Sequence, residues 1–172
     1  MSGVTKHIFE REITDILSMW NCQIKTIQLL LPREYSSKEI ADLLKEFYPH
    51  EWHSVEIKYI YYQTKDRHIK KRFGYYRYNM ERPEVLLLKA NQCTKILSKK
   101  YRHIHYDNYS EEKRIAAQEN LLKQRKPKIE RINQKIEKAL SKTQQVTPSF
   151  IDQLIGLYER NAQAKKIGDI YF

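Results

Sequence analysis

Apolar residues recur at steps of three and four along the first part of the chain, a spacing typical of an amphipathic helix. The positions that follow this spacing are Ile13, Ile16, Leu17, Trp20, Ile24, Ile27 and Leu31. Pro32 ends the run, because proline lacks a backbone N–H and disfavours helix in the residue before it. The pattern predicts helix from 13 to 31, either continuous or broken near Asn21.

The next helix is predicted from its first residues. Ser36 to Glu39 fits a capping box, in which a serine oxygen accepts from first-turn N–H groups and Glu39 reaches back. The apolar side of the helix that follows consists of Ile40, Leu43, Leu44 and Phe47. Pro49 closes this helix near Tyr48, after about three turns.

Two patterns overlap after Pro49. The helical spacing is carried by Trp52, Val55, Tyr59 and Tyr62. The alternation expected of a strand is carried by Val55, Ile57, Tyr59 and Tyr61. We interpret the stretch from about His50 to Gln63 as a helix, because of its length and its position just after a capped helix.

The stretch from Thr64 to Asn79 is the most basic and aromatic part of the chain. Gly74 stands between two runs with a preference for strand, which predicts a small β-hairpin with its turn near this glycine. Cationic side chains neutralise phosphates, and tyrosine rings stack on bases. We therefore predict a nucleic-acid-binding surface made of Lys58, Lys65, Arg67, His68, Lys70, Lys71, Arg72, Tyr75, Tyr76 and Arg77.

The rest of the chain is predicted to be helical around one connector. Pro83 begins a helical stretch, and residues 102–109 read as the connector after it. From 110 to 143 a partial heptad places apolar residues seven apart, at Ile115, Leu122, Ile129 and Ile136. Pro127 predicts two helical pieces or one bent helix in this stretch. Thr147 and Pro148 predict the start of a last helix, which Gly168 would stop.

Composition narrows the class of protein. The chain has 172 residues, with 32 Lys and Arg against 21 Asp and Glu, and a formal net charge of +11. It is too apolar for a disordered chain and too charged for a membrane protein. Its apolar runs are far shorter than the roughly 20 residues of a membrane span, and residues 1–10 do not resemble a signal peptide. Two cysteines exclude a disulfide framework, so we expect a cytoplasmic location.

The order of helix, capped helix, second helix and basic hairpin resembles a winged helix-turn-helix domain over about residues 13–78. The resemblance implies that 37–47 is the positioning helix and that 50–63 is a recognition helix for the major groove. It also implies that 70–79 is the wing. The predicted fold is therefore mainly α, with a winged helix-turn-helix-like N-terminal module that carries a small β-hairpin, and a helical C-terminal region. We expect a nucleic-acid-binding module at 1–100 and an oligomerisation or docking region at 110–172.

These expectations favour a protein that binds nucleic acid, duplex DNA more than RNA, in transcription, replication or mobile-element maintenance. Residues 110–172 would form a homodimer or join a larger protein assembly, and no membrane or cofactor is expected. Two alternatives remain open. One is an RNA-binding component of a ribonucleoprotein, and the other is a non-catalytic interaction module, as a subunit or an inhibitor.

We expect no catalytic or metal-binding residues, although three enzymatic patterns are present in weak form. Glu56 and Lys58 have the spacing of a metal-dependent nuclease, which also needs an upstream acid such as Glu51 or Asp42. The scattered candidates for a zinc site are His50, His53, His103, His105, Cys22 and Cys93. Either cysteine with a distant histidine is the third pattern, a nucleophilic pair.

Overall fold

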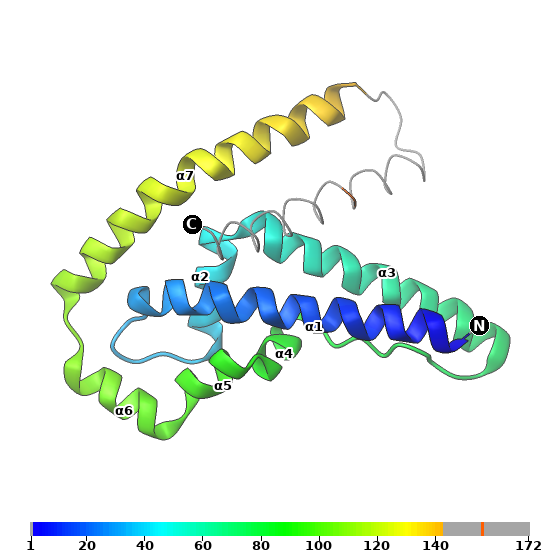
Figure 1. Cartoon of the computed structure of the whole chain (residues 1–172), viewed down its shortest axis with the longest axis horizontal. Helices are drawn as coiled ribbons and strands as arrows, with labels where there is room; N and C mark the ends of the chain where they lie inside the picture. The colour runs from blue at the N-terminus through cyan, green and yellow to red at the C-terminus, as the bar shows by residue number, and fades with distance from the viewer. Residues whose placement is uncertain (1, 143–155, 157–172) are drawn as a thin grey trace.

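The computed structural model describes residues 2–142 and residue 156. In this part of the chain the secondary structure is helical, and no residue is in a strand. Figure 1 shows the helices in chain order, from blue to yellow. Their bounds are α1 Ser2–Ile27, η1 Gln28–Leu30, α2 Ser37–Phe47, α3 Pro49–Phe73, α4 Pro83–Leu86, η2 Leu87–Lys89, α5 Asn91–Leu97, α6 Lys99–Asn108 and α7 Glu111–Ser141.

The two long helices α1 and α3 lie side by side (Figure 1). The ring centroids of Trp20 and Trp52 are 5.4 Å apart at one end of this contact. Further along, the Tyr62 hydroxyl donates a 2.7 Å hydrogen bond to Oε2 of Glu12. Long side chains therefore fill the space between these helices.

The main core is built where α1, α2, α3 and α5 meet. Its fully buried side chains include Trp20 and Ile24 of α1, Leu44 of α2, Val55 of α3 and Ile96 of α5. The apolar faces predicted for residues 13–31 and 40–47 supply much of this core. Burial of each large apolar side chain contributes roughly 1.5–3 kcal/mol, which holds the short helices against the long ones.

The predicted capping box is confirmed. The Ser36 backbone N–H donates to Oε2 of Glu39 at 2.6 Å, and the Ser36 hydroxyl accepts from the Lys38 N–H at 3.3 Å. Hydrogen bonds from Ser36 lower the pKa of Glu39. The helix predicted after Pro49 is also confirmed, with Pro49 in its first turn.

The predicted β-hairpin, and with it the wing, is wrong. Helix α3 continues through residues 64–73 and ends at Gly74, whose φ of 84° is the left-handed conformation of a helix C-cap. The backbone that returns from Gly74 has no strand partner in the described residues. Instead, the carboxylate of Asp66 accepts the N–H groups of Arg77, Tyr78 and Asn79 at 2.7–2.9 Å. A buried side chain thus takes the place of strand pairing.

Two further expectations about helices need correction. The helical stretch predicted from Pro83 is divided, because Ala90 has extended backbone between η2 and α5. The predicted connector at 102–109 is instead most of α6. Ser98 is the N-cap of α6, and its hydroxyl accepts from the Tyr101 N–H at 3.2 Å.

Helix α7 runs without interruption through Pro127, so of the two predicted alternatives the one with two pieces is wrong and a single helix is formed. It is attached to the core by Leu121 and by Arg125, whose Nε donates to the Phe47 carbonyl at 2.8 Å. The guanidinium also lies 3.6 Å from the buried carboxylate of Glu51. The division at residues 100–110 and self-association through 110–172 stay predictions, and the helix predicted from Thr147 lies outside the described residues.

Across residues 2–142, none of the helices combines the length and the hydropathy that a membrane crossing requires. The longest of them, α7, carries charged residues along its whole length.

Candidate functional site

The residues predicted to bind nucleic acid gather mainly at the end of α3. Nine of the ten lie between residues 65 and 77, and we call this group the α3 tip: Lys65, Arg67, His68, Lys70, Lys71, Arg72, Tyr75, Tyr76 and Arg77. The tenth, Lys58, lies about two turns earlier on α3. Its Nζ is 3.5 Å from Oε2 of Glu12 on α1, so the structure separates it from the tip.

The α3 tip spreads its charge outward. Successive residues of an α-helix point about 100° apart, so Lys70, Lys71 and Arg72 face three directions. Their contacts are local, since Nζ of Lys70 is 5.4 Å from the Tyr76 ring centroid. Cζ of Arg72 is likewise 5.2 Å from that of Phe73. The tip is therefore a convex basic surface.

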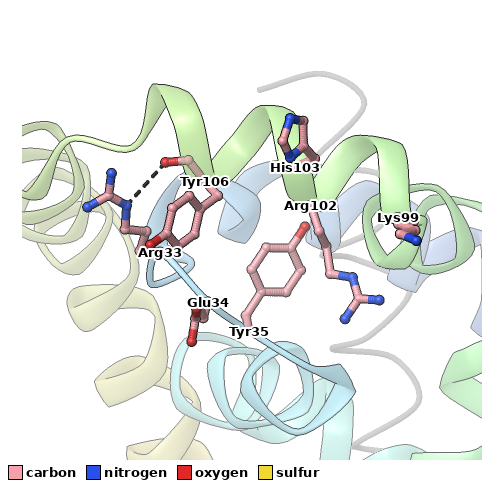
Figure 2. Close-up of a pocket in the computed structure, with 7 residues that line it drawn as sticks. All are labelled: Arg33, Glu34, Tyr35, Lys99, Arg102, His103 and Tyr106. Atoms are coloured by element: carbon pink, nitrogen blue, oxygen red, sulfur yellow. Dashed lines mark hydrogen bonds between the residues drawn. The ribbon is translucent and has the colours of Figure 1, made fainter.

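A different set of cationic residues converges on a pocket between α6 and the segment that precedes α2. The volume of this pocket is about 420 Å³. Figure 2 shows its lining, which consists of Arg33, Glu34, Tyr35, Lys99, Arg102, His103 and Tyr106. We call it the cationic pocket, because four of the seven side chains are basic and only Glu34 is acidic.

One face of α6 supplies more than half of this lining. Lys99, Arg102, His103 and Tyr106 follow the spacing i, i+3, i+4 and i+7, which places them on the same side of a helix. The Ser98 cap marks where the helix begins, so all four of these residues lie within α6. Sequence reasoning missed this face because residues 102–109 were interpreted as a connector.

Arg33 and Tyr106 form a paired wall of the pocket. Cζ of Arg33 lies 4.3 Å from the centroid of the Tyr106 ring. Its Nε donates a 3.2 Å hydrogen bond to the backbone carbonyl of Tyr106 (dashed in Figure 2). These two contacts hold the guanidinium in place and leave its charge at the pocket.

Tyr35 lies between the two ends of the pocket in Figure 2. Its side chain is buried, and its hydroxyl donates to the Ile96 carbonyl. Burial raises the pKa of Tyr35 to about 12, while the nearby Arg102 guanidinium acts in the opposite direction. Tyr35 therefore stays neutral at physiological pH and links the pocket to α5.

The remaining basic side chains of the pocket are accessible. Lys99, Arg102 and His103 are all exposed, and Nε2 of His103 lies 3.3 Å from a carboxylate oxygen of Asp107. Within the described part of the chain, no carboxylate lies within ion-pair distance of Lys99 or Arg102. Their positive charge is thus open to an anionic ligand, and such pairs form strong charge-assisted hydrogen bonds.

The weaker enzymatic patterns are not assembled into sites in residues 2–142. Glu56 and Lys58 lie on α3, so the strand arrangement of a nuclease is not formed. Nε2 of His50 donates a 2.7 Å hydrogen bond to Oδ1 of Asn133, and Nε2 of His105 donates a 2.9 Å hydrogen bond to the Pro32 carbonyl. Burial raises the pKa of the Cys93 thiol to about 11, which suits a core residue more than a nucleophile.

Comparison with known proteins gives one informative relative. No protein-family model and no solved structure matches the chain. A protein of Cytobacillus dafuensis that carries the name cyclic ADP-D-ribose synthase TIR2 is 30% identical over 163 residues. The alignment covers 93% of this chain and 42% of the relative, so the chain spans less than half of that protein's length.

This relative corrects the predicted function. Its name is that of an enzyme that forms a cyclic nucleotide, which contradicts a DNA-binding role in transcription, replication or mobile-element maintenance. The same name also contradicts the two alternatives, which were an RNA-binding component and a non-catalytic interaction module. The prediction that the chain is not an enzyme is overturned by the same similarity.

Proposed function

We propose that the protein acts in the formation of a cyclic ADP-ribose nucleotide and that the cationic pocket holds the diphosphate of the ADP-ribosyl ligand. The observation that carries this proposal is the convergence of Arg33, Lys99 and Arg102 on one pocket. The similarity to a protein named as a cyclic ADP-ribose synthase supports it independently.

The chemistry of ring closure explains why such a pocket is needed. In an ADP-ribosyl donor such as NAD⁺, the bond from the terminal ribose to its leaving group breaks, and the leaving group takes the electron pair. A nucleophilic atom of the same molecule then bonds to that carbon, and that end of the molecule releases a proton to water. The diphosphate does not react, but its position decides whether the two ends of the molecule meet.

The pocket residues suit this holding role. The planar guanidinium group of Arg102 matches the oxygens of a phosphate, and Lys99 on the same face of α6 adds a second charge. A diphosphate carries negative charge throughout the reaction. Binding by these residues therefore positions the ligand without taking part in bond cleavage.

The first test is binding of ADP-ribose by isothermal titration calorimetry. The wild-type protein is compared with Lys99→Gln/Arg102→Gln and with a matched control at the α3 tip, Lys70→Gln/Lys71→Gln. All four substituted side chains are exposed, so both double variants should fold. Each charge-assisted hydrogen bond contributes on the order of 1.5 kcal/mol or more, so the pocket variant should bind roughly 100-fold more weakly.

The control variant should bind ADP-ribose like the wild type. Equal weakening in both variants would contradict the pocket, because it would mean that net charge alone drives binding. In parallel, the wild-type protein is incubated with NAD⁺, and cyclic ADP-ribose is measured by mass spectrometry. No cyclic product together with no ADP-ribose binding would contradict the proposed function.

A further inference from the structure

One end of the cationic pocket has a flat surface that phosphate recognition alone does not require. The Arg33 guanidinium covers one face of the Tyr106 ring and is bonded to the Tyr106 carbonyl. Both residues are exposed, with 41% of Tyr106 accessible. Because the Arg33 guanidinium is already held in place, stacking of a ligand ring on it costs little additional side-chain entropy.

The cationic side chains of α6 lie toward the other end. Figure 2 shows Arg102 and Lys99 on the opposite side of Tyr35 from the Arg33–Tyr106 pair. Lys99 and Tyr106 are two turns apart on α6, about 10 Å along the helix axis. A ligand that uses both ends therefore has negative charge at one end and a flat ring at the other.

The pocket is also larger than an inorganic anion requires. Its volume of about 420 Å³ lies within the range of roughly 300–1,000 Å³ that is usual for organic ligands. Tyrosine rings and guanidinium planes are the protein groups on which nucleic bases commonly stack. A nucleoside diphosphate combines these features, with a base, a ribose and a terminal diphosphate in order.

We infer that the cationic pocket is a nucleoside diphosphate site, with the base stacked at the Arg33–Tyr106 pair and the phosphates bound by Lys99 and Arg102. This inference rests on the proposed function, which requires only that the pocket hold a diphosphate. It adds recognition of the base and thereby names the adenosine half of an ADP-ribosyl ligand as the half that this pocket binds.

The inference is tested by calorimetry with two probes, ADP and inorganic pyrophosphate. The wild-type protein should bind ADP about tenfold more tightly than pyrophosphate, since a stacked base adds roughly 5- to 150-fold in affinity. Tyr106→Leu should remove the preference for ADP and leave pyrophosphate binding within about twofold. Tyr106→Phe keeps the ring and should keep the preference, and circular dichroism confirms that both variants fold.

The outcomes distinguish failure of the base site from failure of the proposed function. Equal affinities for ADP and pyrophosphate in the wild type would overturn the base site while leaving the phosphate site in place. A preference for ADP that survives in Tyr106→Leu would overturn it as well. Failure of both probes to bind would contradict the base site and the proposed function together.

Discussion

The α3 tip and the cationic pocket are both rich in positive charge and tyrosine, but they are built in opposite ways. The tip is a single run of sequence in which neighbouring side chains point apart around one helix. The pocket joins residues 33–35 to residues 99–106, so that side chains far apart in the sequence line one hollow. A charge run in a sequence therefore reports local composition, whereas a binding pocket requires convergence that only the fold supplies.

The largest expected difference between the two regions is in stability. Asp66→Asn removes the charge of the carboxylate that accepts three backbone N–H groups below the α3 tip. We expect a loss of about 2 kcal/mol in the free energy of unfolding, measured by urea denaturation. The affinity for ADP-ribose should stay within about twofold of the wild type, because the pocket does not depend on this carboxylate.

Asp42→Asn is the matched control for that experiment, because Asp42 is an exposed carboxylate on α2. Its effect on the free energy of unfolding should stay within about 0.5 kcal/mol. A similar stability for both variants would show that Asp66 does not anchor residues 77–79.

The second difference concerns the start of α6. Ser98→Ala removes the N-cap, which should lower the free energy of unfolding by about 1 kcal/mol. Because Lys99, Arg102 and His103 lie in the first turns of α6, ADP-ribose affinity should also fall several-fold. The measurement combines thermal denaturation with calorimetric titration.

Ser110→Ala is the control here, because Ser110 is the N-cap of α7 and is not part of the pocket. It should cost a comparable amount of stability and leave ADP-ribose affinity unchanged. If both variants lost affinity equally, the position of α6 would not be what organises the pocket.

The smallest effect is a pH dependence at Tyr35. The pKa of Tyr35 is raised from its ordinary value of 10 to about 12 in the folded protein, because burial disfavours the phenolate. The unfolded chain therefore loses this proton first, and the contribution of Tyr35 to stability decreases as the pH rises above about 10. Tyr35→Phe removes this titration, along with the hydrogen bond to Ile96.

The measurement is urea denaturation of wild type and Tyr35→Phe at several pH values. The wild type should be more stable by about 1 kcal/mol near neutral pH. This advantage should shrink by roughly 1 kcal/mol between about pH 9.5 and pH 11. A constant difference over that range would mean that the Tyr35 hydroxyl is not shielded from water.

Local signals in the sequence predicted local structure well. Ser36 to Glu39 predicted the start of α2, and the length of the stretch after Pro49 and its position after a capped helix led correctly to helix over strand. These features depend on residues within one or two turns of each other. The same is true of the apolar residues between Trp20 and Leu31, which form part of the core as expected.

The hairpin prediction failed where local preference and tertiary contact disagree. The residues around Gly74 favour strands by type, but Tyr62, Asp66 and Ile69 share one face of a helix that packs toward α1 and residues 77–79. The signal for the pocket was present in part, as the spacing of Lys99, Arg102, His103 and Tyr106 after Ser98. Arg33, which pairs with Tyr106 in the pocket, lies 73 residues from it in the sequence, and no local pattern relates the two.

The most direct test of the central claim is a crystal structure of the protein with ADP-ribose. Electron density for the diphosphate beside Arg102 and Lys99, with the adenine against Arg33 and Tyr106, is the predicted result. Ligand density at the α3 tip with an empty cationic pocket would contradict the account.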